Sequence, residues 1–518
     1  MQATFTGVNI ATRGLYASQA GLAVTTGNTS NAKTTGYSRQ TVNQTAVTPA
    51  ASYGGNAIIG NGVEVTSIDQ ERDALLDQRY WTENTRAGEW ETKSNTLTEV
   101  EEVLNNATTS TGFSSIFDEF YGALEDLKDS PGDSATRSQV KEYGQAVCDY
   151  LNDASSRLTD IKDGLNTSVK TTATQINSYA DQIAALNQRI SVVTATNGNS
   201  NTLKDQRNVL VDELTELTGC TVTQNDDSSM TVQLGSATLV DGSKSNNLIV
   251  SQDATSTMYK LTWENTGETA TITGGTLKAE LDLRDGDGSN GTYKGVDYYV
   301  NQLNTFAQTF AKAFNEGVLA SDTASGATTG SYNGTADGYT TTGDRYVRFF
   351  SYTDANGVVD ITEKMDTAGG LVDEVAASTS VYANVTAANI CLSSEIQSSV
   401  NNIAAALAAN ETENSDIVTD LIDMCQDTKM FNKGTPGDYY NSIISTLATD
   451  SDTAQRRDDS YSSVVKQISN RRTSVSGVDT NEETAYMTQY QEAYDASAQM
   501  VSTWNEVFSA TINMLNSD

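Results

Sequence analysis

The sequence contains no histidine, only three prolines and only four cysteines in 518 residues. Without histidine, Ser-His-Asp and Cys-His catalysis and His-ligated zinc are excluded. Cys148, Cys220, Cys391 and Cys425 lie far apart, which fits neither a disulfide framework nor a zinc pattern. The scarcity of proline is compatible with long uninterrupted helices. We therefore expect a protein that is not an enzyme, with no catalytic residues, no cofactor and no metal.

Basic residues are also scarce. The chain has 32 lysines and arginines against 67 aspartates and glutamates, which gives a formal net charge of -35. Nucleic acids and anionic membrane surfaces are both bound by clustered positive charge, so neither is an expected partner. The sequence has no apolar run of about 18 residues, the length that spans a bilayer. Its N-terminus lacks the basic start and apolar core of a secretory signal, so none is expected.

Helical patterns dominate the chain outside its middle. Between about 140 and 193, apolar residues alternate at four and three positions over a stretch typical of a coiled-coil-like rod. Further helices are expected over residues 69–105, 113–127 and 203–217, and again from about 394 to the end. Residues 221–387 instead alternate apolar and polar side chains between glycine and asparagine turns, which predicts strands with one embedded helix over 296–318.

These patterns predict an α+β multidomain protein. We expect the N- and C-terminal helices to pair as a coiled coil, beside a long helical-bundle domain and a β-rich outer domain inserted in the middle of the chain. The expected domains are a terminal coiled-coil assembly domain (1–40 with 478–518), a helical rod-like domain (41–219 with 388–477) and a β-rich outward-facing domain (220–387).

Both ends of the chain carry regular seven-residue stripes. The N-terminal stripe consists of apolar and small residues: Val8, Ala11, Leu15, Ser18 and Leu22. The C-terminal stripe is longer and rich in aromatic residues: Met487, Tyr490, Tyr494, Ser497, Val501, Trp504, Phe508, Thr511 and Leu515. Sustained heptads indicate coiled-coil pairing. Because a narrow stripe buries little area unless neighbouring subunits share it, we interpret these residues as an assembly interface; an ordinary core within one chain is the alternative.

The two ends also differ in charge. The first 63 residues contain no aspartate or glutamate, and Arg13, Lys33 and Arg39 make them basic. After Arg472 there is no lysine or arginine, and the acidic residues that follow include Glu482. Opposite charges favour contact between the two ends and set the orientation of that contact.

Four segments resemble one protein family. Residues 9–22 (NIATRGLYASQAGL) and 28–40 (NTSNAKTTGYSRQ) are similar to the opening of flagellar rod, hook and hook-associated axial proteins, with Thr29 and Thr35 in place of the usual isoleucine and proline. Residues 476–494 (SGVDTNEETAYMTQYQEAY) resemble the C-terminal signature of the same family. Tyr-Ser-Arg at 37–39 and the segment 203–219 indicate the hook-associated members at the junction between hook and filament.

The resemblance implies a structural subunit that self-assembles through its terminal helices into a ring between hook and filament. It implies type III export without a cleaved signal peptide, and an extracellular location on the bacterial flagellum. The implied partners are further copies of the chain, the hook protein, hook-associated protein 3 and an export chaperone at the C-terminal helix. Three alternatives stay open: hook-associated protein 3 itself, a flagellin-like filament subunit, and a secreted hydrolase or adhesin displayed by the outer domain.

Overall fold

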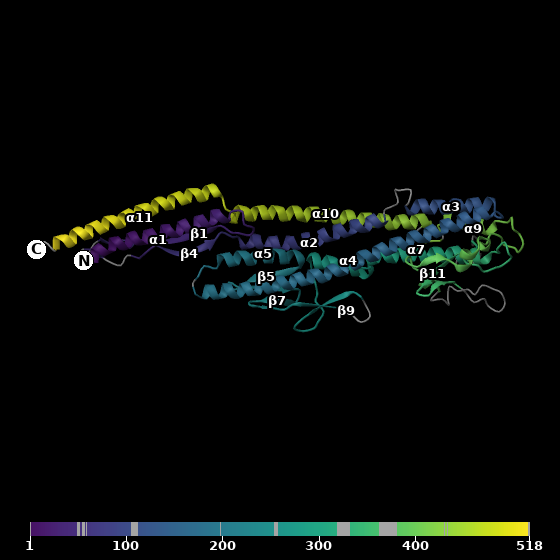
Figure 1. The fold of residues 1–518 in the computed structure, drawn as a ribbon, viewed down its shortest axis with the longest axis horizontal. Coiled ribbons are helices and arrows are strands. Elements are labelled where there is room, and N and C mark those ends of the chain that lie inside the picture. The colour runs from purple at the N-terminus through teal and green to yellow at the C-terminus, as the bar shows by residue number, and fades with distance from the viewer. Residues whose placement is uncertain are drawn as a thin grey trace, which may run out of the picture. The chain divides into compact units, whose positions relative to one another are not determined.

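The structure is a computed structural model that describes residues 2–48, 52–53, 57–58, 60–104, 112–196, 198–252, 257–318, 332–361, 381–428, 430–431 and 434–515. Long helices dominate it, and its strands form several small antiparallel sheets (Figure 1). The α+β class expected from the sequence is confirmed. Within the described ranges, every helix is too short or too polar to cross a membrane.

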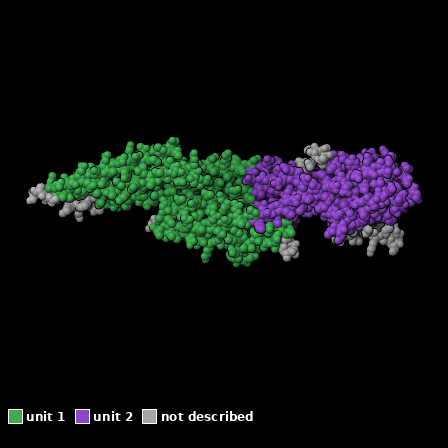
Figure 2. Space-filling model, in the orientation of Figure 1, with its two compact units in different colours: residues 1–89, 171–278, 459–518 green, residues 90–170, 279–458 purple. Residues whose placement is uncertain are grey.

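Contacts divide the chain into two compact units, each assembled from separate segments (Figure 2). The first unit comprises residues 1–89, 171–278 and 459–518, and the second comprises residues 90–170 and 279–458. The three-domain division expected from the sequence stays a prediction, because these units group residues by contact and not by role in assembly.

The two chain ends lie together in the first unit. Helix α1 (Gln2–Asn31) runs beside α11 (Thr480–Leu515), and strands β1 (Gln40–Ala46) and β4 (Val63–Gln70) pack against α1 (Figure 1). The two strands pair antiparallel, with a register shift between Asn43 and Gln44. A second pair of short strands, β2 (Ser52–Tyr53) and β3 (Ala57–Ile58), lies between them in sequence. The pairing of terminal helices expected from the heptads is confirmed.

The rest of the first unit combines long helices with a small sheet. Its helical parts come from α2 (Ala74–Leu104), α4 (Ser134–Ala195), α5 (Asn201–Leu217), α6 (Gly275–Asp285) and α10 (Pro436–Ser476). Its strands are β5 (Cys220–Gln224), β6 (Met230–Leu234), β7 (Ala237–Asp241), β8 (Lys244–Ser245), β9 (Leu248–Gln252) and β10 (Tyr259–Trp263). The first four form one antiparallel sheet in sequence order, and the last two form a hairpin. Met230, Val232 and Leu234 are buried, as alternation along a half-buried strand requires.

The second unit has an aromatic core. It contains α3 (Phe113–Asp129), α7 (Val296–Glu316), α8 (Ser394–Ser398), α9 (Asp416–Gln426), β11 (Phe350–Asp354), β12 (Gly357–Val359) and β13 (Ile390–Leu392), with parts of α2, α4, α6 and α10. Phe306, Phe310 and Phe314 lie four residues apart on α7 and are almost completely buried. The rings of Phe306 and Phe310 stack at 5.7 Å between centroids. The four-residue spacing places the three rings on one face of α7.

The helix expected from residue 394 onward is interrupted. Helix α8 has five residues, and α9 begins only at Asp416. Between them Ser399 accepts a hydrogen bond from the backbone N–H of Asn401 with its side chain, and Asn410 has a positive φ of 67°. Serine and asparagine side chains compete for backbone groups in this way and favour turns over helix. Likewise, the helix expected from residue 69 begins at Ala74, because 63–70 forms β4.

Candidate functional site

Three glycines on α1 bring the terminal helices into close contact. Gly7 and Gly21 lie fourteen residues apart, with Gly14 midway, so all three share one face of the helix. A Cβ atom on Gly21 would lie 2.5 Å from a ring carbon of Tyr490, and one on Gly7 would lie 2.2 Å from a ring carbon of Trp504. Because such distances are shorter than any van der Waals contact, only glycine permits these rings to lie against the backbone of α1.

The contacts follow a regular antiparallel register. Gly7 faces Trp504, Gly14 faces Ser497 and Gly21 faces Tyr490, so each step of seven residues along α1 matches a step of seven backward along α11. Asn28 and Glu483 continue both series and hydrogen-bond to each other. A heptad repeat on both helices keeps one face in contact over this length.

The structure places the predicted interface residues in three groups. On α1, Ala11 and Ser18 are buried between the glycines, whereas Val8, Leu15 and Leu22 are half-buried beside them. On α11, Ser497 is buried, Thr511 is exposed, and the remaining described residues are half-buried: Met487, Tyr490, Tyr494, Val501, Trp504 and Phe508. Leu515 ends α11, and its side chain lies outside the described residues. The assembly role of all these residues stays a prediction.

Asn28 joins α1 to the strand that follows it and to α11. Its side-chain amide donates to the backbone carbonyl of Gln40 at 2.9 Å and to Glu483 Oε2 at 3.0 Å. Its carbonyl oxygen accepts from the Gln40 backbone N–H at 3.0 Å and from the Tyr37 hydroxyl at 2.9 Å. Burial is the main cause that raises the pKa of Tyr37, and the nearby carboxylates of Asp205 and Glu483 raise it further. The tyrosine therefore stays protonated and serves as a donor.

Arg39 contacts the first turns of α11 and the end of α10. Its Nε donates to Glu483 Oε1 at 2.8 Å, and its guanidinium also pairs with Glu482 at 3.2 Å. The guanidinium lies over the Tyr486 ring, 5.6 Å from the centroid. The Arg39 backbone N–H donates to the carbonyl of Ser476, at the end of α10. The side chain of Glu483 is 2% exposed, so water cannot stabilise its negative charge. Arg39 and Asn28 stabilise the buried carboxylate instead.

Replacing Asn28 with alanine should weaken the contact between the end of α1 and the start of α11. The change leaves the Gln40 backbone groups and one oxygen of Glu483 without their buried partner, at a cost of about 1–3 kcal/mol. Hydrogen exchange in residues 480–490 should accelerate by roughly 5- to 140-fold, since about 1.4 kcal/mol corresponds to a factor of ten. Ser30→Ala, on an exposed position of the same helix, is the control. Equal exchange in both variants would contradict this role for Asn28.

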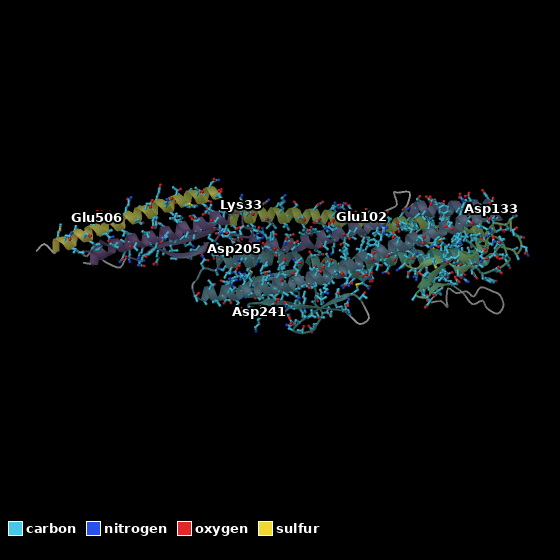
Figure 3. All side chains as sticks on the ribbon, viewed as in Figure 1. Lys33, Glu102, Asp133, Asp205, Asp241 and Glu506 are labelled. Atoms are coloured by element: carbon cyan, nitrogen blue, oxygen red, sulfur yellow. The ribbon has the colours of Figure 1, made fainter. Side chains whose placement is uncertain are left out.

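A second polar cluster in the first unit surrounds Ser38, the residue before Arg39. Arg72 pairs with Asp77 at 2.9 Å, and its guanidinium donates to the Ser38 hydroxyl at 3.3 Å. Asp205 on α5, labelled in Figure 3, accepts from the Gln70 side chain and from the Ser38 backbone N–H. The two distances are 2.8 Å and 3.3 Å. Burial raises the pKa of Asp205, and these hydrogen bonds oppose that rise. The cluster thus ties residues that flank β1 and β4 to α5.

Arg472 near the end of α10 completes the cluster. It pairs with Asp77 at 2.9 Å and with Asp212 at 2.9 Å, and its guanidinium lies 4.3 Å from the centroid of the Tyr80 ring. Asp212 also accepts from the indole N–H of Trp81 at 2.7 Å. Burial raises the pKa of Asp212, whereas Arg472 opposes the rise. Helices α2, α5 and α10 are joined here by ionic and hydrogen bonds.

The glycine face of α1 and the two polar clusters were not predicted from the sequence. The signal for the glycines was present, because Gly7, Gly14 and Gly21 follow the same seven-residue period as the apolar residues one position later. The heptad prediction considered apolar side chains only, so it did not include these glycines. The contacts of Asn28 and Glu483 join residues far apart in sequence, so no local pattern indicates them.

Comparison with known proteins agrees with this fold. Residues 97–331 match the family model described as the flagellar hook-associated protein FlgK helical domain, and residues 470–514 match the flagellar basal body rod FlgEFG protein C-terminal model. Flagellar hook-associated protein 1 of Bacillus subtilis (strain 168) is 28% identical over 540 residues, which cover 99% of each chain. Its namesake in Escherichia coli (strain K12) is 25% identical over 558 residues, 98% of this chain and 99% of the relative.

A solved structure shares the fold. The flagellar hook junction protein FlgK from Burkholderia pseudomallei matches with a TM-score of 0.57 at 15% identity, over 77% of this chain and 100% of that one. The family resemblance found in the sequence is thereby confirmed over the whole length of the chain. The chain belongs to the family of flagellar hook-associated protein 1, and its role is that of a structural component of the bacterial flagellum.

Proposed function

We propose that the chain is a subunit of the junction between the flagellar hook and the filament, and that copies assemble through the terminal helix pair formed by α1 and α11. The observation that carries the proposal is full-length likeness to relatives named hook-associated protein 1, together with a C-terminal match to an axial family model over the residues that form α11. These names favour this role over that of hook-associated protein 3 or a filament subunit.

The proposal includes the partners that the family resemblance implies. The hook protein lies on one side of the ring and hook-associated protein 3 on the other, and an export chaperone holds α11 before type III export. The terminal residues 1–40 and 478–518 form the assembly domain, residues 41–219 with 388–477 form the helical domain, and residues 220–387 face outward. The half-buried aromatic residues of α11 support an assembly role, because burial of such rings stabilises contacts between subunits.

Deletion of the chromosomal copy tests the proposal. Negative-stain images of the deletion strain should show hooks that lack filaments, with filament subunits released into the medium. The full-length chain supplied on a plasmid should restore filaments, and the same chain without residues 480–515 should not. Filaments of normal length and number on the deletion strain would refute the junction role.

The acidity of the chain predicts salt-dependent association. Each copy carries a formal charge of -35, so copies repel one another where charges are poorly screened. The screening length falls from about 30 Å at 0.01 M salt to about 10 Å at 0.1 M. We expect larger assemblies of the purified chain at 0.15 M than at 0.01 M salt in sedimentation velocity, with an unchanged circular dichroism spectrum. Association that weakens as salt rises would contradict this account.

A further inference from the structure

Helix α11 carries an exposed apolar stripe that does not face α1. Ala493, Met500 and Val507 lie seven residues apart, and Met500 and Val507 are 51% and 42% exposed. Tyr486, seven residues before Ala493 and 38% exposed, continues the stripe toward the start of the helix. The face that meets α1 is a different one, because it carries Tyr490, Ser497 and Trp504. We call Ala493, Met500 and Val507 the α11 stripe.

Helix α1 carries a second apolar stripe on its side. Val8, Leu15 and Leu22 each follow one of the glycines that face α11, and all three are half-buried. One residue corresponds to about 100° around a helix, so this stripe points sideways from the helix pair. We call Val8, Leu15 and Leu22 the α1 stripe.

The strands β1 and β4 cover the opposite side of α1. A Cβ atom on Gly62, which precedes β4, would lie 3.2 Å from the α-carbon of Ile10, and Arg13 pairs with Glu64 of β4 at 3.4 Å. Ile10 follows Val8 by two residues, which correspond to about 200° of rotation. The α1 stripe therefore lies on the side of the helix pair that the strands leave uncovered.

The α11 stripe begins on the strand side of the pair. Arg39, the residue before β1, lies over the ring of Tyr486. Since Tyr486 shares the seven-residue period of Ala493, Met500 and Val507, the four residues lie on one face of α11. One copy thus presents two unlike apolar stripes on opposite sides of its terminal helix pair.

We infer that the α1 stripe of one copy docks against the α11 stripe of a second copy, so that copies join through two different faces. The inference rests on the proposed function and specifies which surfaces join the copies. Contact between unlike faces is head-to-tail and repeats from copy to copy, and it closes into a ring where the rotation between copies permits. Contact between two identical faces would instead end at a dimer.

Charge determines which helix of the second copy fits the α11 stripe. Helix α11 carries acidic residues, among them Glu492, Asp495 and Glu506, and no lysine or arginine. Glu506 is labelled in Figure 3. Two α11 helices side by side would therefore repel each other. Helix α1 has no acidic residue, so its contact with α11 adds no such repulsion. Of the two terminal helices of a second copy, α1 is the one that α11 accepts.

The two stripes also match in length. The outer residues of the α1 stripe, Val8 and Leu22, are fourteen positions apart, as are Ala493 and Val507 of the α11 stripe. At 1.5 Å per residue each stripe extends about 21 Å. The three side chains of the α1 stripe can then be covered by the three of the α11 stripe, and exposed Tyr486 and Met514 extend the apolar series of α11 beyond that contact at both ends.

Cross-linking in assembled flagella tests the inference. Two differently tagged full-length chains, one with Leu15→Cys and one with Met500→Cys, are expressed together in the deletion strain, both in a Cys220→Ala background. Isolated flagella are treated with a short bismaleimide cross-linker. We expect a covalent dimer that carries both tags. Gln499→Cys replaces Met500→Cys in the matched control, because the neighbouring position is exposed but turned by about 100° from the stripe.

The outcomes separate the inference from the proposed function. A two-tag dimer from Leu15→Cys with Met500→Cys, together with little product from Leu15→Cys with Gln499→Cys, supports contact between unlike stripes. Dimers in flagella that contain only Leu15→Cys chains, or only Met500→Cys chains, would show contact between identical faces and overturn the inference. Flagella that contain both chains without any two-tag dimer would also overturn it. Absence of the wild-type chain from flagella would instead refute the proposed function.

Discussion

Replacing Gly21 with leucine should separate α1 from α11 and prevent incorporation of the chain into flagella. Even the first side-chain atom would lie 2.5 Å from the ring of Tyr490, and leucine adds three further carbons at a buried position. Overpacking of a well-packed contact typically costs about 1–3 kcal/mol. A helix pair held by one narrow face has little further contact area to compensate. Immunoblots of purified flagella should show loss of the variant, while its amount in the cells stays normal.

Gly27→Ala is the matched control for this prediction. Gly27 lies on the same helix, and a Cβ atom there would meet only the hydroxyl of Tyr37, at 4.0 Å. Alanine is favoured over glycine within a helix by roughly 1 kcal/mol, so α1 should form at least as well as before. Normal incorporation of Gly27→Ala together with loss of Gly21→Leu would assign the effect to the contact with Tyr490. Normal incorporation of both variants would show that assembly does not need the close approach of α1 and α11.

The pairing of the chain ends could be predicted from the sequence because two independent patterns agreed. The heptads at both ends and their opposite charges each favour contact, and α11 runs beside α1 in the structure. On α11 the predicted positions include the residues that face the glycines, Tyr490, Ser497 and Trp504. Large aromatic side chains at heptad spacing indicate the contact face of a helix in its sequence. Burial of such side chains contributes much of the free energy of a helix–helix contact.

The glycine face of α1 was not predicted, for a physical reason. The apolar residues at heptad spacing on α1 are Val8, Leu15 and Leu22, although the glycine before each of them is the residue that meets α11. Where one helix supplies bulky rings, the other must supply space, and glycine supplies it without an apolar side chain. Small residues at heptad spacing opposite an aromatic heptad therefore indicate close backbone contact, even where larger residues lie one position away.

The buried polar clusters could not be predicted, because their energetics depend on partners that are far apart in the sequence. Arg472 and Asp212 are 260 residues apart, and Asn28 and Glu483 are 455 residues apart. A charged residue in an acidic chain is most often solvated, so its type alone carries little information. Only the fold shows that Glu483 is 2% exposed and that two side chains replace its water.

Replacing Arg472 with alanine should destabilise the first unit by roughly 3 kcal/mol. The change removes the partner that Asp77 and Asp212 share, and loss of one member of a buried ion pair typically costs about 3–5 kcal/mol. Arg472 is 16% exposed, which places the effect at the lower end of that range. Tryptophan fluorescence, which includes the signal of Trp81 beside Asp212, should show unfolding at lower urea concentration. Arg471→Ala, on the exposed neighbouring residue, should leave the urea midpoint unchanged.

The destabilisation by Arg472→Ala should depend on pH in a defined direction. Burial raises the pKa of Asp212, and loss of Arg472 removes a group that lowers it. A carboxyl group whose pKa is raised by folding favours the folded state at low pH, and that contribution disappears as the pH rises through the folded-state pKa. The difference in urea midpoint between variant and wild type should therefore be smaller at pH 5 than at pH 7. Adding Asp212→Asn removes the unpaired charge, keeps an acceptor for Trp81 and should recover part of the lost stability at pH 7. A pH-independent deficit that Asp212→Asn does not reduce would show that Arg472 stabilises the unit through its stacking on Tyr80 and not through its charge.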